Sequence, residues 1–290
     1  DKEIILGLRN DIFCFNVESI PELEVINELA VRENKIASIC LRVNPNIKAH
    51  THTHIRTGVA ENKFGIAFDE IMYVIKLANT MSNITFKGLH FHIGSQITEM
   101  DDFISLCMCI NRLLEMMDVE GIKAEIINVG GGLGVDYDTP QMHAIPDFHA
   151  YFQTYINNLQ LRPWQTLHFE LGRSVVAQCG TLFTRVLYVK KGVQKQFAIV
   201  DAGMTDLIRP ALYHAHHKIE NISSTAKTYE YYDVVGPICE STDVFDKQVG
   251  MPTTKRGDIL AIHSIGAYGE VMASHYNCRA LPKAYTDKEI

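Results

Sequence analysis

The stretch Gly88-Leu-His-Phe-His-Ile-Gly-Ser-Gln96 has the pattern of a β-strand that ends in a tight polar turn. Apolar residues alternate with His90 and His92, so the two imidazoles are predicted to lie on one face of the strand. An imidazole at a strand end, followed by the backbone amides of Gly94 and Ser95, is suited to stacking on a flat ring and holding a phosphate. The alternative is a half-buried strand whose histidines pair with neighbouring backbone.

The composition is that of an ordinary globular protein. The 290 residues suffice for one large or two medium domains, and 47% of them are hydrophobic. A net charge of -7 gives no basic field for nucleic acid, and no apolar run reaches the length of a membrane span. Seven cysteines without regular spacing argue against a disulfide framework, so we expect a reducing, cytoplasmic location.

Strands and helices alternate along the first part of the chain. The patterns predict strands over residues 12–17, 37–43, 84–93, 125–129 and 166–169. They predict helices over residues 3–9, 19–34, 69–79, 101–117 and 147–159. Ser19-Ile-Pro-Glu22 has the form of a capping box with proline in the first turn, and Asp69 is expected to cap the third helix.

This alternation is typical of a parallel α/β architecture. The informative residues Asn44, His92, Gly130 and Glu170 lie at the carboxyl ends of successive strands, at the edge where a (β/α)8 TIM-type barrel has its active site. A doubly wound sheet also binds ligands at this edge, but phosphate-type turns after the late strands favour the barrel. No complete Gly-x-Gly-x-x-Gly or Walker sequence is present.

The pattern changes near residue 175, so we expect a barrel unit over residues 1–174 and a β-rich domain over residues 175–290. Strands are predicted at residues 181–191, 196–201, 231–236 and 258–264, without long helices between them. Polar clusters follow three of these strands, at residues 201–213, 236–243 and 264–269, the last opening a helix at Glu270. Each cluster alone reads as a surface loop, whereas three together favour a shared site.

Several motifs resemble the pyridoxal-phosphate decarboxylases of fold type III, which are built on an alanine-racemase-type barrel. They are His92-Ile-Gly-Ser95, Gly130-Gly-Gly132, Glu170-Leu-Gly-Arg173, Cys239-Glu-Ser-Thr-Asp243 and Gly266-Ala-Tyr268-Gly269. Glu61-Asn-Lys-Phe-Gly-Ile66, Asp201-Ala-Gly-Met-Thr-Asp206 and Arg209-Pro-Ala-Leu-Tyr213 narrow the resemblance to the diaminopimelate decarboxylases. Glu240 supports this, because relatives acting on ornithine or arginine usually carry Asp there.

The resemblance implies decarboxylation of meso-2,6-diaminopimelate to L-lysine, with pyridoxal phosphate as the electron sink. It implies a cofactor site made of His92, Ser95, Gly130, Gly131, Gly132, Glu170, Gly172, Arg173 and Tyr268. Glu170 would face the pyridine nitrogen and favour its charged form, although a structural ion pair with Arg173 is the alternative. His92 would stack on the ring.

The substrate's far end carries a second amino-acid head, and the resemblance assigns its recognition as well. Binding of the substrate is implied for Arg173, Arg209, Tyr213, Glu240 and Tyr268. Cys239 would protonate the carbanion as general acid, unless it is only a small buried hydrophobe. In the family this cysteine and Glu240 reach the site from a neighbouring subunit, so a homodimer is implied.

Two departures from the family pattern stand out. The Schiff-base lysine of a Tyr-x-x-Lys-Ala-Asn-type motif is absent from this sequence, and Leu171 stands where proline is usual. By the family pattern, an N-terminal β segment and the first three barrel strands lie outside residues 1–290. We therefore expect these residues alone to be poorly folded and without decarboxylase activity.

Three other functions stay open from sequence. One is a related pyridoxal-phosphate decarboxylase of basic amino acids or polyamine precursors. Another is a metal-dependent barrel hydrolase, with His90 and His92 joined by residues of the His50, His52 and His54 loop. Such a site would need an aspartate at the end of the last strand, where Glu170-Leu-Gly-Arg173 fits poorly, and no metal is expected. A non-catalytic cofactor-binding relative is disfavoured by the β-rich domain.

Overall fold

The computed structural model describes residues 1–47, 63–286 and 288, and the chain divides into two compact units. Unit 1 comprises Asp1–Gly134 and Asp147–Leu171, and unit 2 comprises Val135–Pro146 and Gly172–Ile290. Each unit has its own hydrophobic core. The division after residue 174 that the sequence favours stays a proposal.

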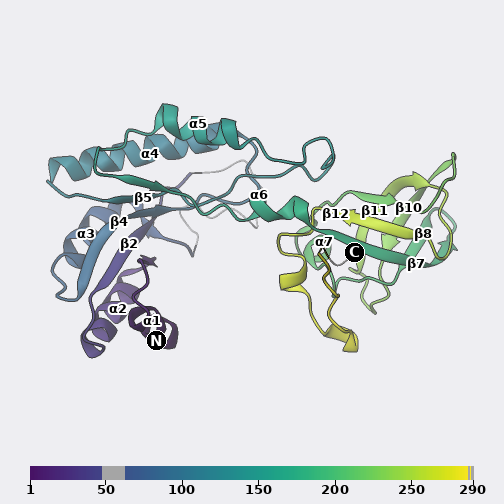
Figure 1. Ribbon diagram of the computed structural model, residues 1–290, viewed down its shortest axis with the longest axis horizontal. Helices are drawn as coiled ribbons and strands as arrows, with labels where there is room; N and C mark the ends of the chain where they lie inside the picture. Colours follow the sequence, from purple (N-terminus) through teal and green to yellow (C-terminus); the bar gives the residue numbers. More distant parts are fainter. Residues whose placement is uncertain (48–62, 287, 289–290) are drawn as a thin grey trace. The chain divides into compact units, whose positions relative to one another are not determined.

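Unit 1 alternates strands with helices, as the sequence pattern predicts (Figure 1). Its strands are β1 (Phe15–Val17), β2 (Ala37–Asn44), β3 (Ile66–Ala67), β4 (Ile84–Phe91), β5 (Ile126–Asn128) and β6 (Thr166–His168). Its α-helices are α1 (Lys2–Arg9), α2 (Ile20–Arg32), α3 (Ile71–Ala78), α4 (Met100–Val119) and α5 (Phe148–Asn158), of which the last two run side by side. The sheet order is β1-β2-β4-β5-β6, with β3 also on β2, and these pairs are all parallel.

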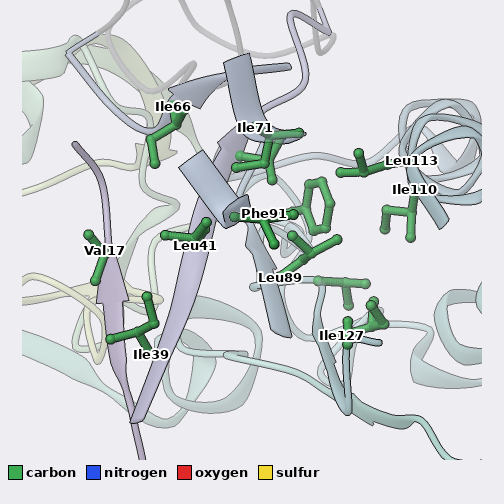
Figure 2. Close-up of a cluster of buried hydrophobic side chains, with 14 of the residues drawn as sticks. Val17, Ile39, Leu41, Ile66, Ile71, Leu89, Phe91, Ile110, Leu113 and Ile127 are labelled. Atoms are coloured by element: carbon green, nitrogen blue, oxygen red, sulfur yellow. The ribbon is translucent and has the colours of Figure 1, made fainter. Parts of the chain in front are cut away.

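The two faces of the parallel sheet differ in character. Leu41, Leu89 and Phe91 point into a core that includes Ile71 of α3 and Ile110 of α4 (Figure 2). The alternate residues of the same strands, among them Arg42, Gly88 and His90, belong to the other face. The period-two pattern of the sequence therefore separates a hydrophobic face from a polar one, as expected.

Helix starts show where local signals succeed and where they fail. The hydroxyl of Ser19 accepts a hydrogen bond from the Glu22 amide at 3.3 Å, which confirms the predicted start of α2. The capping prediction for Asp69 is wrong. Asp69 lies inside the 3-10 turn η2 (Phe68–Glu70), and Glu70 is the N-cap of α3 without a side-chain bond. The turn moves the helix start past Asp69.

Unit 2 is built on a six-stranded sheet with the order β11-β10-β8-β7-β12-β9. The strands are β7 (Thr181–Lys191), β8 (Gln196–Val200), β9 (Ile219–Asn221), β10 (Tyr229–Val235), β11 (Val244–Pro252) and β12 (Ile259–His263). Four correspond to predicted strands, whereas β9 and β11 were missed. Short helical segments are α6 (Arg173–Val176), η3 (Ala177–Cys179), α7 (Arg209–Tyr213), η4 (Glu270–Met272) and η5 (Tyr276–Cys278).

Two further observations concern helices. The helix predicted at Glu270 is only the single 3-10 turn η4, which ends where Ala273 adopts an extended conformation. Among the residues that the structure describes, no helix is both long and apolar enough to cross a membrane.

Candidate active site

The strand register of unit 1 brings polar residues into one row. His90 of β4 pairs with Arg42 of β2 on one side and with Asn128 of β5 on the other, and Asn128 pairs with His168 of β6. Two residues further along, on the same face, the strands reach Asn44, His92, Gly130 and Glu170. Parallel strands therefore gather at one edge the four residues that the sequence placed at strand ends.

The carboxylate of Glu170 is held by three side chains from three strands. His90 Nε2 lies 3.1 Å from Glu170 Oε2. On the other oxygen, Oε1, Asn128 donates through Nδ2 at 2.9 Å and Asn16 at 3.3 Å. The His90 ring is 4% exposed and its Nδ1 has no partner among the described residues. The tautomer with hydrogen on Nε2 is favoured, because it donates to the carboxylate and leaves no buried N–H unpaired.

These bonds keep Glu170 ionised. The pKa of its carboxyl falls to about 2, chiefly because of the hydrogen bond from His90, with Asn128 adding to the effect and partial burial opposing it. The side chain is 45% exposed, so the charge is fixed in place yet accessible. Such a carboxylate can hold a proton on a basic ring nitrogen placed against it.

His92 is tied to the glycine-rich turn after β5. The Gly131 amide donates to His92 Nδ1 at 3.3 Å. Burial lowers the pKa of His92 to about 4, and the charges of Arg42 and His90 lower it further against the opposing effect of Glu170. The imidazole is therefore neutral at physiological pH, which suits a ring that accepts a hydrogen bond at its edge and offers its flat face to a ligand.

Close packing explains why this turn is glycine-rich. A Cβ on Gly130, which has φ +70°, would lie 2.3 Å from the Phe91 carbonyl oxygen. A Cβ on Gly131 would lie 2.3 Å from the Glu170 carbonyl oxygen. The amide of Gly130 donates to Asn128 Oδ1 at 2.9 Å, so both amides already have protein partners. Ser95 and Gly132 are partly exposed, so these two positions are more accessible to an anion than the buried Gly130 and Gly131.

Unit 2 contains a separate cluster of two buried arginines. Arg173 Nη1 donates to the Tyr137 hydroxyl at 2.6 Å, and Arg209 Nη1 donates to the same oxygen at 3.2 Å. The Arg173 guanidinium also lies 5.0 Å from the ring centroid of Tyr268. Besides Tyr137, Arg209 contacts His217, whose Nε2 lies 2.9 Å from Arg209 Nη1. This cluster unites two predicted arginines with the predicted Tyr268.

The loop that carries Cys239 and Glu240 is shaped by Asp243. The buried Asp243 carboxylate accepts hydrogen bonds from the Ile238 amide at 2.7 Å and from the Met204 amide at 2.6 Å. Cys239 and Glu240 themselves are exposed, and Glu240 Oε1 accepts a hydrogen bond from the hydroxyl of Tyr276. Asp243 therefore joins two of the three clusters predicted to share a site, residues 201–213 and 236–243.

The remaining predicted residues occupy less constrained positions. Gly172 is the N-cap of α6, and a Cβ there would meet no neighbour within 4 Å. Tyr213 ends α7 and is partly buried, while Tyr268 is 42% exposed with φ 63°. The histidines His50, His52 and His54 lie outside the described residues. Among the residues described, no group of three metal-ligating side chains comes together.

Sequence reasoning missed four residues of these two clusters: Asn16, Asn128, Tyr137 and His217. Asn128 had a readable signal, because an asparagine that ends an apolar strand two residues before three glycines has few other reasons to be there. Asn16 and Tyr137 had none, since their partners Glu170 and Arg209 lie 154 and 72 residues away. His217 lies only eight residues from Arg209, but no motif between them indicated the contact.

Comparisons with known proteins show the family of this chain. The pyridoxal-binding domain of the pyridoxal-dependent decarboxylases matches residues 2–177. The diaminopimelate decarboxylase of Bacteroides thetaiotaomicron is 61% identical over 290 residues, which is all of this chain and 75% of that protein. The Haemophilus influenzae enzyme of the same name is 43% identical, and the match covers 96% of this chain and 66% of that protein.

Solved structures support the same relationship. The crystal structure of a point mutant of Helicobacter pylori diaminopimelate decarboxylase, complexed with L-lysine, superimposes with a TM-score of 0.89 at 40% identity, covering 96% of this chain and 68% of that chain. The fold is therefore that of these enzymes, part of a (β/α)8 barrel followed by a β-rich region. This relationship disfavours the metal-hydrolase alternative. The chain belongs to the diaminopimelate decarboxylase family of pyridoxal-dependent decarboxylases.

Proposed function

We propose that the protein decarboxylates meso-2,6-diaminopimelate to L-lysine. The observation that carries this proposal is the Glu170 carboxylate, which three side chains hold ionised at the carboxyl edge of a pyridoxal-binding domain. Pyridoxal phosphate, when bound, supplies an electron sink for the pair left on Cα after loss of carbon dioxide. A solved relative from Helicobacter pylori binds L-lysine, the product expected here.

In this proposal Glu170, His92 and the glycine-rich turns bind and orient the cofactor. Glu170 holds a proton at the pyridine nitrogen, because an anion beside that nitrogen stabilises its charged form. The neutral His92 offers its ring face. The phosphate would lie against the turns around Ser95 and Gly130–Gly132, where the glycines let the backbone approach closely and Ser95 and Gly132 are the accessible positions. Gly172 and Tyr268 would contact it as well.

A second group of residues would recognise the far end of the substrate. Arg173, Arg209 and Tyr213 would bind the second carboxylate, because guanidinium groups pair with carboxylates through charge-assisted hydrogen bonds. Glu240 would bind the second ammonium. Cys239 would deliver a proton to Cα as general acid, for which its exposed position allows access.

Assembly and location belong to the same proposal. A homodimer would complete the site by bringing Cys239 and Glu240 to the neighbouring subunit. All seven cysteines are free, which fits a reducing cytoplasm. The nearest competing function is decarboxylation of another basic amino acid by the same chemistry.

A substrate panel tests the proposal. The complete protein, loaded with pyridoxal phosphate, is given meso-diaminopimelate, ornithine, arginine or lysine, and released carbon dioxide is measured. We expect kcat/KM for diaminopimelate to exceed the others by at least about 100-fold, since a missing carboxylate leaves buried charged groups unpaired. The matched variant Glu240→Asp should lower diaminopimelate turnover. Equal or faster turnover of ornithine by the unmodified protein would contradict the assignment.

A further inference from the structure

Arg209 is buried, yet its positive charge is not neutralised within its cluster. The residue is 6% exposed, and its described polar partners are the Tyr137 hydroxyl and the imidazole of His217. Burial lowers the pKa of Arg209, the charge of Arg173 lowers it too, and the tyrosines oppose this. Among the described residues, no carboxylate forms an ion pair with Arg209. Its charge is therefore left for a ligand.

His217 fixes the direction in which the Arg209 guanidinium points. Its ring is 1% exposed, and its Nδ1 lies 2.9 Å from the carbonyl oxygen of His263 at the end of β12. The His263 amide in turn donates to the Lys218 carbonyl at 2.9 Å. Two hydrogen bonds therefore hold residues 217–218 against the end of β12. The ring also packs edge-on against Tyr137, with centroids 5.1 Å apart. These contacts leave the imidazole little freedom.

The hydrogen-bond partners also fix the proton on this ring. A carbonyl oxygen can only accept, so Nδ1 carries the hydrogen and donates to His263. Nε2 then has a lone pair, which accepts the N–H of Arg209. Burial lowers the pKa of His217 to about 4, with Arg209 and Arg173 contributing to the decrease and the His263 carbonyl opposing it. At neutral pH the ring is a neutral acceptor.

We infer that His217 is a positioning residue that aims Arg209 at the second carboxylate of the substrate without cancelling its charge. The inference rests on the proposed function, because it takes that carboxylate as the ligand of Arg209. A carboxylate in the place of His217 would also hold the guanidinium. It would, however, form an ion pair with it and compete with the substrate. A neutral acceptor is the group that orients the arginine and keeps its charge available.

A pair of isosteric variants separates charge from shape. His217→Glu and His217→Gln place side chains of equal size toward Arg209, one charged and one neutral. In each holoenzyme we measure by calorimetry the affinities for L-lysine and 1,5-diaminopentane, which differ only by one carboxylate. We expect the glutamine variant to keep most of the preference for lysine. In the glutamate variant the ratio of the two affinities, lysine over 1,5-diaminopentane, should fall about 10- to 100-fold, which is the range of one charge-assisted hydrogen bond.

Steady-state kinetics should agree with the binding result. The glutamate variant should raise KM for diaminopimelate far more than it lowers kcat, whereas a general packing defect would lower the thermal stability of both variants alike. If the glutamate variant does not fold, His217→Leu replaces it, and lysine should then bind more weakly to the leucine variant than to the glutamine variant. Equal lysine preference in the compared variants would overturn the inference. An unmodified enzyme that neither prefers lysine nor turns over diaminopimelate would instead contradict the proposed function.

Discussion

The hydrogen bond between His90 and Glu170 can be measured by removing each partner separately and together. His90→Phe keeps a ring in the buried position and removes the donor, and Glu170→Ala removes the carboxylate. The double variant completes the cycle, so that the interaction free energy is obtained apart from the cost of each substitution.

The structure gives the size of the expected coupling. The pKa of Glu170 falls from its ordinary 4.5 to about 2, a difference equivalent to ~3 kcal/mol for all partners together. The side chain is 45% exposed, so solvent screening reduces this to about half. His90 is the largest contributor, and we therefore expect a coupling of about 1 kcal/mol at pH 7.

The pH dependence has a definite sign. The unfolded carboxyl takes up a proton near pH 4.5 and the folded one only near pH 2, so the stabilisation is complete above pH 4.5 and is lost as the pH falls toward 2. Urea unfolding of the complete, cofactor-free protein is followed by tryptophan fluorescence, since Trp164, the one tryptophan of residues 1–290, lies in unit 1 with both residues. A coupling below ~0.3 kcal/mol at pH 7 would refute the reasoning, because the uncertainty of such cycles is of that order. A coupling that does not fall as the pH drops from 4.5 toward 2 would refute it as well.

Four single substitutions test other parts of the account. Gly88→Ala should destabilise the protein by about 3 kcal/mol in urea unfolding, because the added Cβ would lie 2.0 Å from the Ile126 carbonyl oxygen; an unchanged midpoint would contradict this. Asp243→Asn should cost ~2 kcal/mol in the same assay, since an amide cannot accept both backbone N–H groups as the carboxylate does. Tyr137→Phe should raise KM for diaminopimelate about tenfold by removing the oxygen that two guanidiniums share, and an unaltered KM would count against the cluster as a substrate site. Cys239→Ala should lower kcat about 100-fold or more with little change in KM. Full activity of this variant in a carbon-dioxide release assay would exclude a role of Cys239 as general acid.

The fold could be predicted where hydrophobic periodicity is strong. In β2 and β4 the alternation identifies strand, face and approximate bounds. The strand β11 escaped prediction because Asp246, Lys247 and Gln248 interrupt its apolar pattern, and because Gln248 has φ 55° where the pairing with β10 is irregular. Its pairing with β10 is a tertiary property, which no local pattern of residues contains.

The candidate site was predictable to a similar degree. Motifs pointed to Glu170 and His92 because glycine and charged residues at strand ends have few structural explanations. The partners that give Glu170 its charge could not be found, since the register that places His90 beside Asn128 is set by packing of whole strands. His217 likewise reads as an ordinary histidine until the bond to Arg209 is seen.

The most direct test of the central claim is the reaction of the complete, pyridoxal-phosphate-loaded protein with meso-diaminopimelate in deuterium oxide. The product is identified by mass spectrometry and released carbon dioxide is measured in parallel. Decarboxylation followed by protonation at Cα predicts lysine with one deuterium on carbon, formed in equal amount with carbon dioxide. Diaminopimelate that acquires deuterium without losing carbon dioxide would indicate a racemase instead, and would contradict the decarboxylase function proposed for this protein.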